Sequence, residues 1–241
     1  MRANLDLILK RLTLGRMAEI LPAELARARE KKVSYEDFLE RLLTAQFNHR
    51  QETALAWRIS KAKLPEQWSL DTFPYDQQPG LDERRIRELE ELDFIHRAEN
   101  IVFMGPTGVG KTGLACGLLL KALRQGHRAL FVRAQDLFDD MYASVADRST
   151  RKFLDHLVRI PLICVDELGY LNLKPEQTNI FFKLMEERYR RFPTIITTNL
   201  DFVEWGGLLG NPALVDALLS RLRHHCHTVR IDGPSLRALQ G

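Results

Sequence analysis

Eight residues near the middle of the 241-residue chain have the types and spacing of a phosphate-binding loop. They are Gly105, Pro106, Thr107, Gly108, Val109, Gly110, Lys111 and Thr112, and they fit the pattern G-x-x-x-x-G-K-[ST]. Glycine adopts positive φ and carries no Cβ, so this backbone can wrap closely around a phosphate with its N–H groups pointing inward. Lys111 offers a mobile charge to the β- and γ-phosphates, and Thr112 offers a hydroxyl to Mg²⁺. The pattern predicts a site for a nucleoside triphosphate and its metal.

The flanking sequence supplies the elements that such a loop needs. An apolar run, Ile101–Met104, precedes it, and a helix-forming run, Leu114–Leu120, follows it. This order of strand, loop and helix puts the loop N–H groups at the positive end of a helix dipole. The flanks therefore argue against a chance glycine-rich turn.

Two carboxylates follow a later apolar run, Leu162–Val165. Ligands of parallel sheets sit beyond the carboxyl ends of the strands, so Asp166 is expected beside Thr112, holding Mg²⁺ directly or through water. Glu167 is expected further out, where a carboxylate can act as general base on a water aligned with the γ-phosphate. The alternative interpretation is an ordinary charged strand end.

Asn199 ends the next apolar strand, in the run 197–199. Its amide can donate to a γ-phosphate and accept from the attacking water, which predicts a γ-phosphate sensor. An asparagine after a strand is otherwise a common turn residue.

Two arginines are candidates for a finger that reaches the transition state. Arg221 is the first and Arg188 the second. A guanidinium there neutralises developing negative charge, and either residue would act across a subunit boundary in a ring or helix. Both are otherwise surface arginines.

The elements that must position these residues follow from hydrophobic patterning. From residue 99 onward, strands alternate with helices of 10–15 residues, which predicts an α/β fold with a parallel five-stranded sheet and right-handed crossovers. The expected strands are Ile101–Met104, Ala129–Val132, Leu162–Val165, Thr194–Thr197 and Thr228–Ile231. The expected helices are Thr112–Gln125, Ala134–Ser144, Thr150–Arg159 and Glu176–Arg191.

Two further segments precede this core. Residues 1–65 predict a small all-helical domain, in which Pro22 breaks one helix and Ser34 caps another. This module either binds DNA or a partner, or is a packing appendage. Residues 66–98 are a proline-punctuated connector, in which Phe73 or Tyr75 either touches adenine or packs in the core. Residues 99–241 are the expected catalytic core.

Composition places the chain among globular proteins of the cytoplasm. No window approaches the roughly 18 apolar residues of a membrane span, and the N-terminus lacks a signal-peptide core. The three cysteines are scattered, which favours buried free thiols in a reducing compartment. Residues 1–65 hold 13 basic and 8 acidic residues, a net charge of +5, and the remaining 22 basic and 24 acidic residues give −2. A solvated helix face and a DNA-binding surface explain this excess equally well.

Taken together, the motifs resemble the IstB family, AAA+ ATPases of bacterial insertion sequences that are similar to the DnaC helicase loader. The resemblance spans nearly the whole chain. The residues that carry it are Gly105–Thr112, Val165–Tyr170, Glu187–Tyr189, Thr197–Leu200, Asp201–Trp205, Ser220–His225 and Gly233–Arg237.

The resemblance implies an AAA+ P-loop core and a Mg²⁺-dependent ATPase that takes part in transposition. It implies that the ATP-loaded protein binds duplex DNA, assembles with itself as a ring or helical filament, and delivers target DNA to a partner transposase, IstA. Hydrolysis would then take the assembly apart.

The chain departs from the family pattern at two positions. Gly113 stands where the family usually has His, and Ser220 where Asp is common. Neither is a phosphate ligand, so the departures bear on assembly and hydrolysis behaviour. The short segment after the last strand implies an absent or minimal helical lid, unless Arg237 substitutes for the lid arginine.

Two other functions stay open. A DnaC-like loader would grip a replicative helicase through the N-terminal module and prefer single strands. A nucleotide-gated DNA scaffold would assemble with ATP and turn over negligibly.

Overall fold

The computed structural model describes residues 3–236, and the chain divides into two compact units, residues 1–57 and 58–241. The boundary between these units falls within the long helix α3 (Tyr35–Ala62). We call the first the N-terminal unit and the second the ATPase unit.

The N-terminal unit is helical, with α1 (Ala3–Arg11) and α2 (Gly15–Lys31) preceding α3. Its small core contains Leu9, Met17, Ala18, Leu21 and Leu42. The predicted cap is present, because the Ser34 hydroxyl accepts a 3.1 Å hydrogen bond from the backbone N–H of Asp37.

The predicted helix break at Pro22 is wrong, because α2 continues through it. A proline inside a helix removes one backbone hydrogen bond. Here Met17, Ala18 and Leu21 are buried on one face of α2, while Pro22 is exposed. Packing of that apolar face offsets the local cost.

The ATPase unit is built on a five-stranded parallel sheet in the order β2-β3-β4-β1-β5, which confirms the predicted fold class. The strands are β1 (Asn100–Met104), β2 (Ala129–Arg133), β3 (Leu162–Asp166), β4 (Thr194–Thr198) and β5 (Cys226–Arg230). Strands β1, β3 and β4 are buried at every position, as strands covered on both faces should be.

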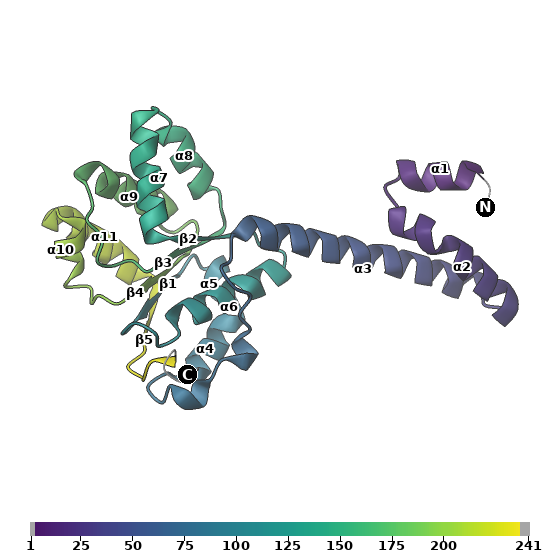
Figure 1. Cartoon of the computed structure of the whole chain (residues 1–241), viewed down its shortest axis with the longest axis horizontal. Helices are drawn as coiled ribbons and strands as arrows, with labels where there is room; N and C mark the ends of the chain where they lie inside the picture. Colours follow the sequence, from purple (N-terminus) through teal and green to yellow (C-terminus); the bar gives the residue numbers. More distant parts are fainter. Residues whose placement is uncertain (1–2, 237–241) are drawn as a thin grey trace. The chain divides into compact units, whose positions relative to one another are not determined.

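Helices cover both faces of this sheet (Figure 1). Helix α6 (Lys111–Arg124) lies on one face. The other face carries α7 (Ala134–Ala146), α8 (Thr150–Val158), α9 (Pro175–Arg188), α10 (Trp205–Leu209) and α11 (Pro212–His224). Helices α10 and α11 add to the four that the sequence predicted. Alternate strand residues such as Val102, Ile163 and Ile196 join the core on the α7–α11 side.

The segment between α3 and β1 is a packed layer rather than a loose linker. It contains two short turns, η1 (Leu70–Thr72) and η2 (Tyr75–Gln77), then α4 (Glu83–Glu90) and α5 (Asp93–His96). Leu70 and Trp68 pack against α6 at Gly117 and Gly113, where a Cβ would leave them less room.

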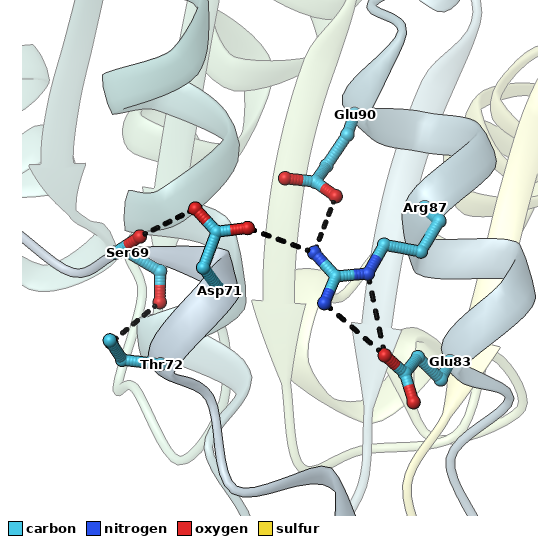
Figure 2. Close-up of polar contacts among 6 residues, drawn as sticks. All are labelled: Ser69, Asp71, Thr72, Glu83, Arg87 and Glu90. Carbon is cyan, nitrogen blue, oxygen red and sulfur yellow. Dashed lines mark hydrogen bonds and ion pairs between the residues drawn. The ribbon is translucent and has the colours of Figure 1, made fainter.

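Arg87 of α4 makes polar contacts with three acidic residues of this layer, as Figure 2 shows. Its guanidinium contacts Asp71 at 3.3 Å, Glu83 at 3.2 Å and Glu90 at 2.9 Å. Its Cζ also lies 5.3 Å from the centre of the Tyr75 ring. One cation therefore joins η1 and η2 to α4, which fixes the segment that leads into β1.

Among residues 3–236, no helix combines the length and apolar character needed to cross a membrane.

Candidate nucleotide site

A groove of about 870 Å³ opens at the carboxyl ends of the parallel strands. The phosphate loop and the start of α6 form its floor; Arg133 and Asp166 are the last residues of β2 and β3, and Asn199 directly follows β4. Trp68 and Leu236 complete the wall. The volume is in the range of small-molecule sites, roughly 300–1,000 Å³.

The phosphate loop adopts the backbone shape that its glycines permit. Gly110 has a φ of +97°, and a Cβ there would meet the Phe73 ring at 2.7 Å. Only glycine fits both the dihedral angle and the available space. Phe73 is itself buried behind the loop and, like Tyr75, is absent from the groove lining. Phe73 therefore packs against the loop from the core side, and adenine contact by Phe73 or Tyr75 stays a prediction.

Lys111 starts α6 and is buried in the loop that precedes it. Its ammonium donates to the carbonyl oxygens of Gly105 at 2.8 Å and Pro106 at 2.6 Å. These contacts hold the Lys111 ammonium at the wall of the groove. A bound phosphate would replace the two carbonyl oxygens as the acceptor of its hydrogen bonds.

Asp166 lies beside Thr112, where the sequence predicted it. The Thr112 hydroxyl donates to Asp166 Oδ1 at 2.9 Å, and the Thr197 hydroxyl of β4 donates to the same oxygen at 2.7 Å. Burial raises the pKa of Asp166, and the two hydroxyl donors oppose that shift. The Asp166 carboxylate and the Thr112 hydroxyl together present hard oxygen atoms, which are the ligands that Mg²⁺ prefers.

Glu167 is exposed and lines the groove one residue further out. Its φ of +59° lies in the left-handed region, which costs a non-glycine residue of order 1 kcal/mol or more. The strained turn is held by the Thr197 hydroxyl, which accepts from the Glu167 N–H at 2.8 Å. The consequence is that the two successive carboxylates point in different directions, one buried and one open to solvent.

Asn199 lies on the same wall, directly over Gly169. A Cβ at Gly169 would overlap the Asn199 side-chain oxygen, so the close approach of these two residues needs a glycine. The two sequence blocks around Asp166 and Asn199 therefore fit together as one surface.

The structure does not support Arg188 as an arginine finger. The side chain is 1% exposed, and its guanidinium donates to the Thr194 hydroxyl and to the carbonyl oxygens of Leu157, Ile160 and Pro193. Burial lowers the pKa of Arg188 to about 9, which still leaves a cation at neutral pH. Arg188 is therefore a buried structural residue, because each of its guanidinium nitrogens already donates a hydrogen bond.

Arg221 is instead exposed on α11 and forms a 3.4 Å ion pair with Glu186. It does not line the nucleotide groove of its own chain. Arg237, the candidate replacement for a lid arginine, lies outside the described residues.

Sequence reasoning missed three residues of the site. Thr197 links Asp166 to Glu167, Arg133 lies opposite Asp166 in the β2–β3 register, and Trp68 forms part of the wall. The pair of threonines that ends β4 was the available signal for Thr197. Nothing local distinguishes Arg133 or Trp68.

Comparisons with known proteins agree with this geometry. The model of the family described as IstB-like ATP binding protein matches residues 7–240. The chain is 39% identical over 227 residues to an insertion sequence IS5376 putative ATP-binding protein of Geobacillus stearothermophilus, covering 94% of this chain and 90% of the relative. It is 35% identical over 234 residues to the IS21 putative ATP-binding protein of Pseudomonas aeruginosa, covering 97% and 88%.

Solved structures share the fold. The DnaC helicase loader matches with a TM-score of 0.57 and 25% identity, over 68% of this chain and 96% of that one. AMPPCP-bound DnaA from Aquifex aeolicus matches with a TM-score of 0.59 and 21% identity, over 70% and 51%. With an AAA+ ATPase fold, a phosphate loop and a family match over nearly its whole length, the chain belongs to the IstB-like ATP-binding proteins.

Proposed function

We propose that this AAA+ ATPase assembles on duplex DNA when it holds ATP and delivers that DNA to a partner transposase of the IstA type. The observation that carries the proposal is the shared hydrogen-bond system of Thr112, Asp166 and Thr197, which builds a nucleotide groove with an acid on its edge. The transposition context rests on relatives whose names assign them to insertion sequences.

The chemistry follows from the positions of the polar side chains. Lys111 leaves its loop carbonyls to contact the β- and γ-phosphates. Glu167 takes a proton from a water whose oxygen attacks the γ-phosphorus, while the bond from that phosphorus to the β,γ-bridging oxygen breaks. Asn199 orients the water and the γ-phosphate. The products are ADP and phosphate.

Thr112 and Asp166 fit a bound Mg²⁺, since both present hard oxygen atoms to the groove. When bound, Mg²⁺ neutralises charge on the phosphate oxygens. Asp166 supplies the negative charge of this pair, and Thr197 keeps its carboxylate turned toward Thr112.

Hydrolysis in the assembly draws on a second subunit. Arg221, exposed and outside its own groove, supplies the finger to a neighbouring nucleotide. Loss of the γ-phosphate then removes the contacts that hold neighbours together, and the assembly leaves the DNA.

Retention on duplex DNA tests the proposal. The wild-type protein should be retained with ATP and released with ADP, measured by fluorescence anisotropy on a labelled duplex. Lys111→Ala should lose the ATP-dependent part, because the phosphate contacts are gone. Retention that is equal with ATP, with ADP and in Lys111→Ala would show that no nucleotide switch operates.

A loader function makes a different prediction, and the likeness to the DnaC helicase loader is the observation that favours it. A loader should prefer single strands and a hexameric helicase, whereas a transposition helper should prefer long duplex. Competition between labelled duplex and unlabelled single strand separates the two. A scaffold would be indicated by ATP-dependent assembly with no turnover even when DNA and transposase are present.

A further inference from the structure

A second groove, of about 650 Å³, lies on the ATPase unit and is lined mainly by cations. We call it the α8 groove. Its charged lining consists of Arg128, Arg148, Arg151, Lys152, Asp155, His156 and Arg159. Five permanent cations therefore face one carboxylate, a local net charge of +4, whereas residues 66–241 as a whole carry −2.

The groove is separate from the nucleotide site. Arg128 directly precedes β2, and Arg133 ends it at the nucleotide groove. Five residue steps along a strand span roughly 17 Å. The α8 groove therefore lies toward the amino ends of the strands, whereas the phosphate loop lies at their carboxyl ends.

Helix geometry brings the cations together. Within α8, residues 151, 152, 155 and 156 lie on one largely exposed face of the helix, and Leu154, Leu157 and Val158 are buried on the other. Arg148 lies in the turn before α8, and Arg159 is the C-cap residue. At 1.5 Å per residue, the nine residues of α8 extend about 13 Å. That length matches about four phosphates along one strand of B-DNA, at roughly 3.4 Å each.

Several of these cations have no acidic partner among the described residues. Arg151 is paired with Asp155 at 3.1 Å and Glu187 at 3.6 Å. Arg128 donates to the carbonyl oxygen of Arg159. Residues 3–236 contain no ion pair for Arg148 or Lys152, and both side chains belong to exposed residues. Clustered like charges repel one another, and an anionic ligand would relieve that repulsion.

Two arginines among residues 1–65 already have hydrogen-bond partners. Arg50 donates to the carbonyl and hydroxyl oxygens of Thr13, and Arg58 donates to the carbonyl oxygen of Leu123. Both guanidiniums donate to neutral oxygens inside their own units, as Arg128 does in the α8 groove.

We propose that the α8 groove binds the phosphate backbone of the duplex DNA on which the protein assembles. This inference rests on the proposed function and adds the surface that makes the contact. The lining offers arginine, lysine and serine side chains that can contact phosphate oxygens, so the proposed contact is to the backbone and is independent of sequence.

The double variant Arg148→Glu with Lys152→Glu tests the inference. Its matched control is Arg84→Glu with Arg85→Glu, which makes the same charge change at two exposed positions on α4. Binding of full-length protein with ATP is measured on two unrelated duplex sequences over a series of salt concentrations. Thermal melting and the binding of a fluorescent ATP analogue verify that both variants are folded.

The α8 variant should bind both duplexes at least about tenfold more weakly than the control. Its plot of log affinity against log salt should be less steep by about 2, because each lost phosphate contact removes roughly 0.9 from the slope. Equal affinity and slope in the α8 and control variants would overturn the inference while leaving the proposed function intact. A loss confined to one sequence would also overturn it. Failure of the wild-type protein to bind duplex DNA with ATP would instead remove the proposed function itself.

Discussion

Thr112 and Asp166 lie 54 positions apart in the sequence, and the threonine hydroxyl donates a 2.9 Å hydrogen bond to the aspartate carboxylate. The contact joins the first turn of α6 to the end of β3. Thr197 donates to the same carboxylate oxygen from β4, so three separate elements meet at one atom. The nucleotide groove has its shape because these elements converge there, and the first predictions concern this point.

Asp166→Asn should weaken Mg²⁺-dependent ATP binding by at least about 10- to 100-fold. The amide keeps the shape of the side chain and can accept from both threonines, but it removes the negative charge. Folding stability should be equal or higher, because a buried charge no longer has to be desolvated. Titration of nucleotide binding against Mg²⁺, alongside thermal melting, checks both parts. An unaltered Mg²⁺ requirement would contradict the assigned role.

Glu167→Gln should lower ATP turnover by about 10²- to 10⁴-fold and leave ATP binding in place, because the general base is lost without a change of shape. Glu167→Asp is the control, since it keeps a carboxylate and tolerates the left-handed backbone at this position. It should retain more turnover than the glutamine variant. Phosphate release in single-turnover conditions is the measurement, and equal rates in wild type and Glu167→Gln would exclude Glu167 as the base.

Arg188→Ala should destabilise the protein by at least about 3 kcal/mol, because it leaves buried oxygens on four residues without their donor. Arg221→Ala is the matched control and should alter stability by no more than about 0.5 kcal/mol, since its ion pair is exposed. Urea unfolding measures both. Similar small losses of unfolding free energy in the two variants would mean that the hydrogen bonds of Arg188 do not stabilise the fold.

Mixing two inactive proteins tests whether Arg221 acts across a subunit boundary. Arg221→Ala keeps Glu167, and Glu167→Gln keeps Arg221, so a neighbouring pair can form one complete site. An equal mixture assembled on DNA should recover up to about a quarter of wild-type turnover if the finger comes from the neighbour. Absence of recovery, with both variants co-assembled, would show that Arg221 does not complete a neighbouring site.

Alkaline pH should destabilise the protein partly through Cys116. Burial raises the pKa of this thiol to about 12, from about 9 when exposed. Above pH 9 the unfolded chain loses the proton while the folded chain keeps it, so stability falls as pH rises. The expected loss from this group is about 1.4 kcal/mol per pH unit.

Cys116→Ala should therefore show a shallower decline of unfolding free energy between about pH 9.5 and 10.5. Slopes rather than absolute values are compared, because the alanine also leaves a small cavity. Identical slopes in urea unfolding series would contradict the assignment.

Local patterns were enough to predict the elements that carry the site. The glycine loop between an apolar strand and a helix, and the acids after Val165, are short-range signals tied to backbone geometry. Parallel topology then followed from alternation of strands and helices, and it put Asp166 beside Thr112. The strand bounds agree to within about two residues, which is the usual uncertainty of element ends.

Longer-range facts were outside the reach of those patterns. Pro22 looked like a helix break, and only the burial of Met17 and Leu21 explains why α2 continues. Arg188 has charged neighbours in the sequence and Arg221 has leucines near it, yet Arg188 is buried and Arg221 is exposed.

The sequence by itself determined the phosphate loop, the strand-end acids and the parallel sense of the sheet, because each depends on residues close together in the chain or on the alternation of strands and helices. Tertiary structure alone decided that Thr197 shares the Asp166 carboxylate, that Gly169 makes room for Asn199, and that Arg128 joins the cations of α8. Those contacts form only when packing brings distant segments within a few ångströms, and side-chain burial and charge then follow from that neighbourhood rather than from residue type.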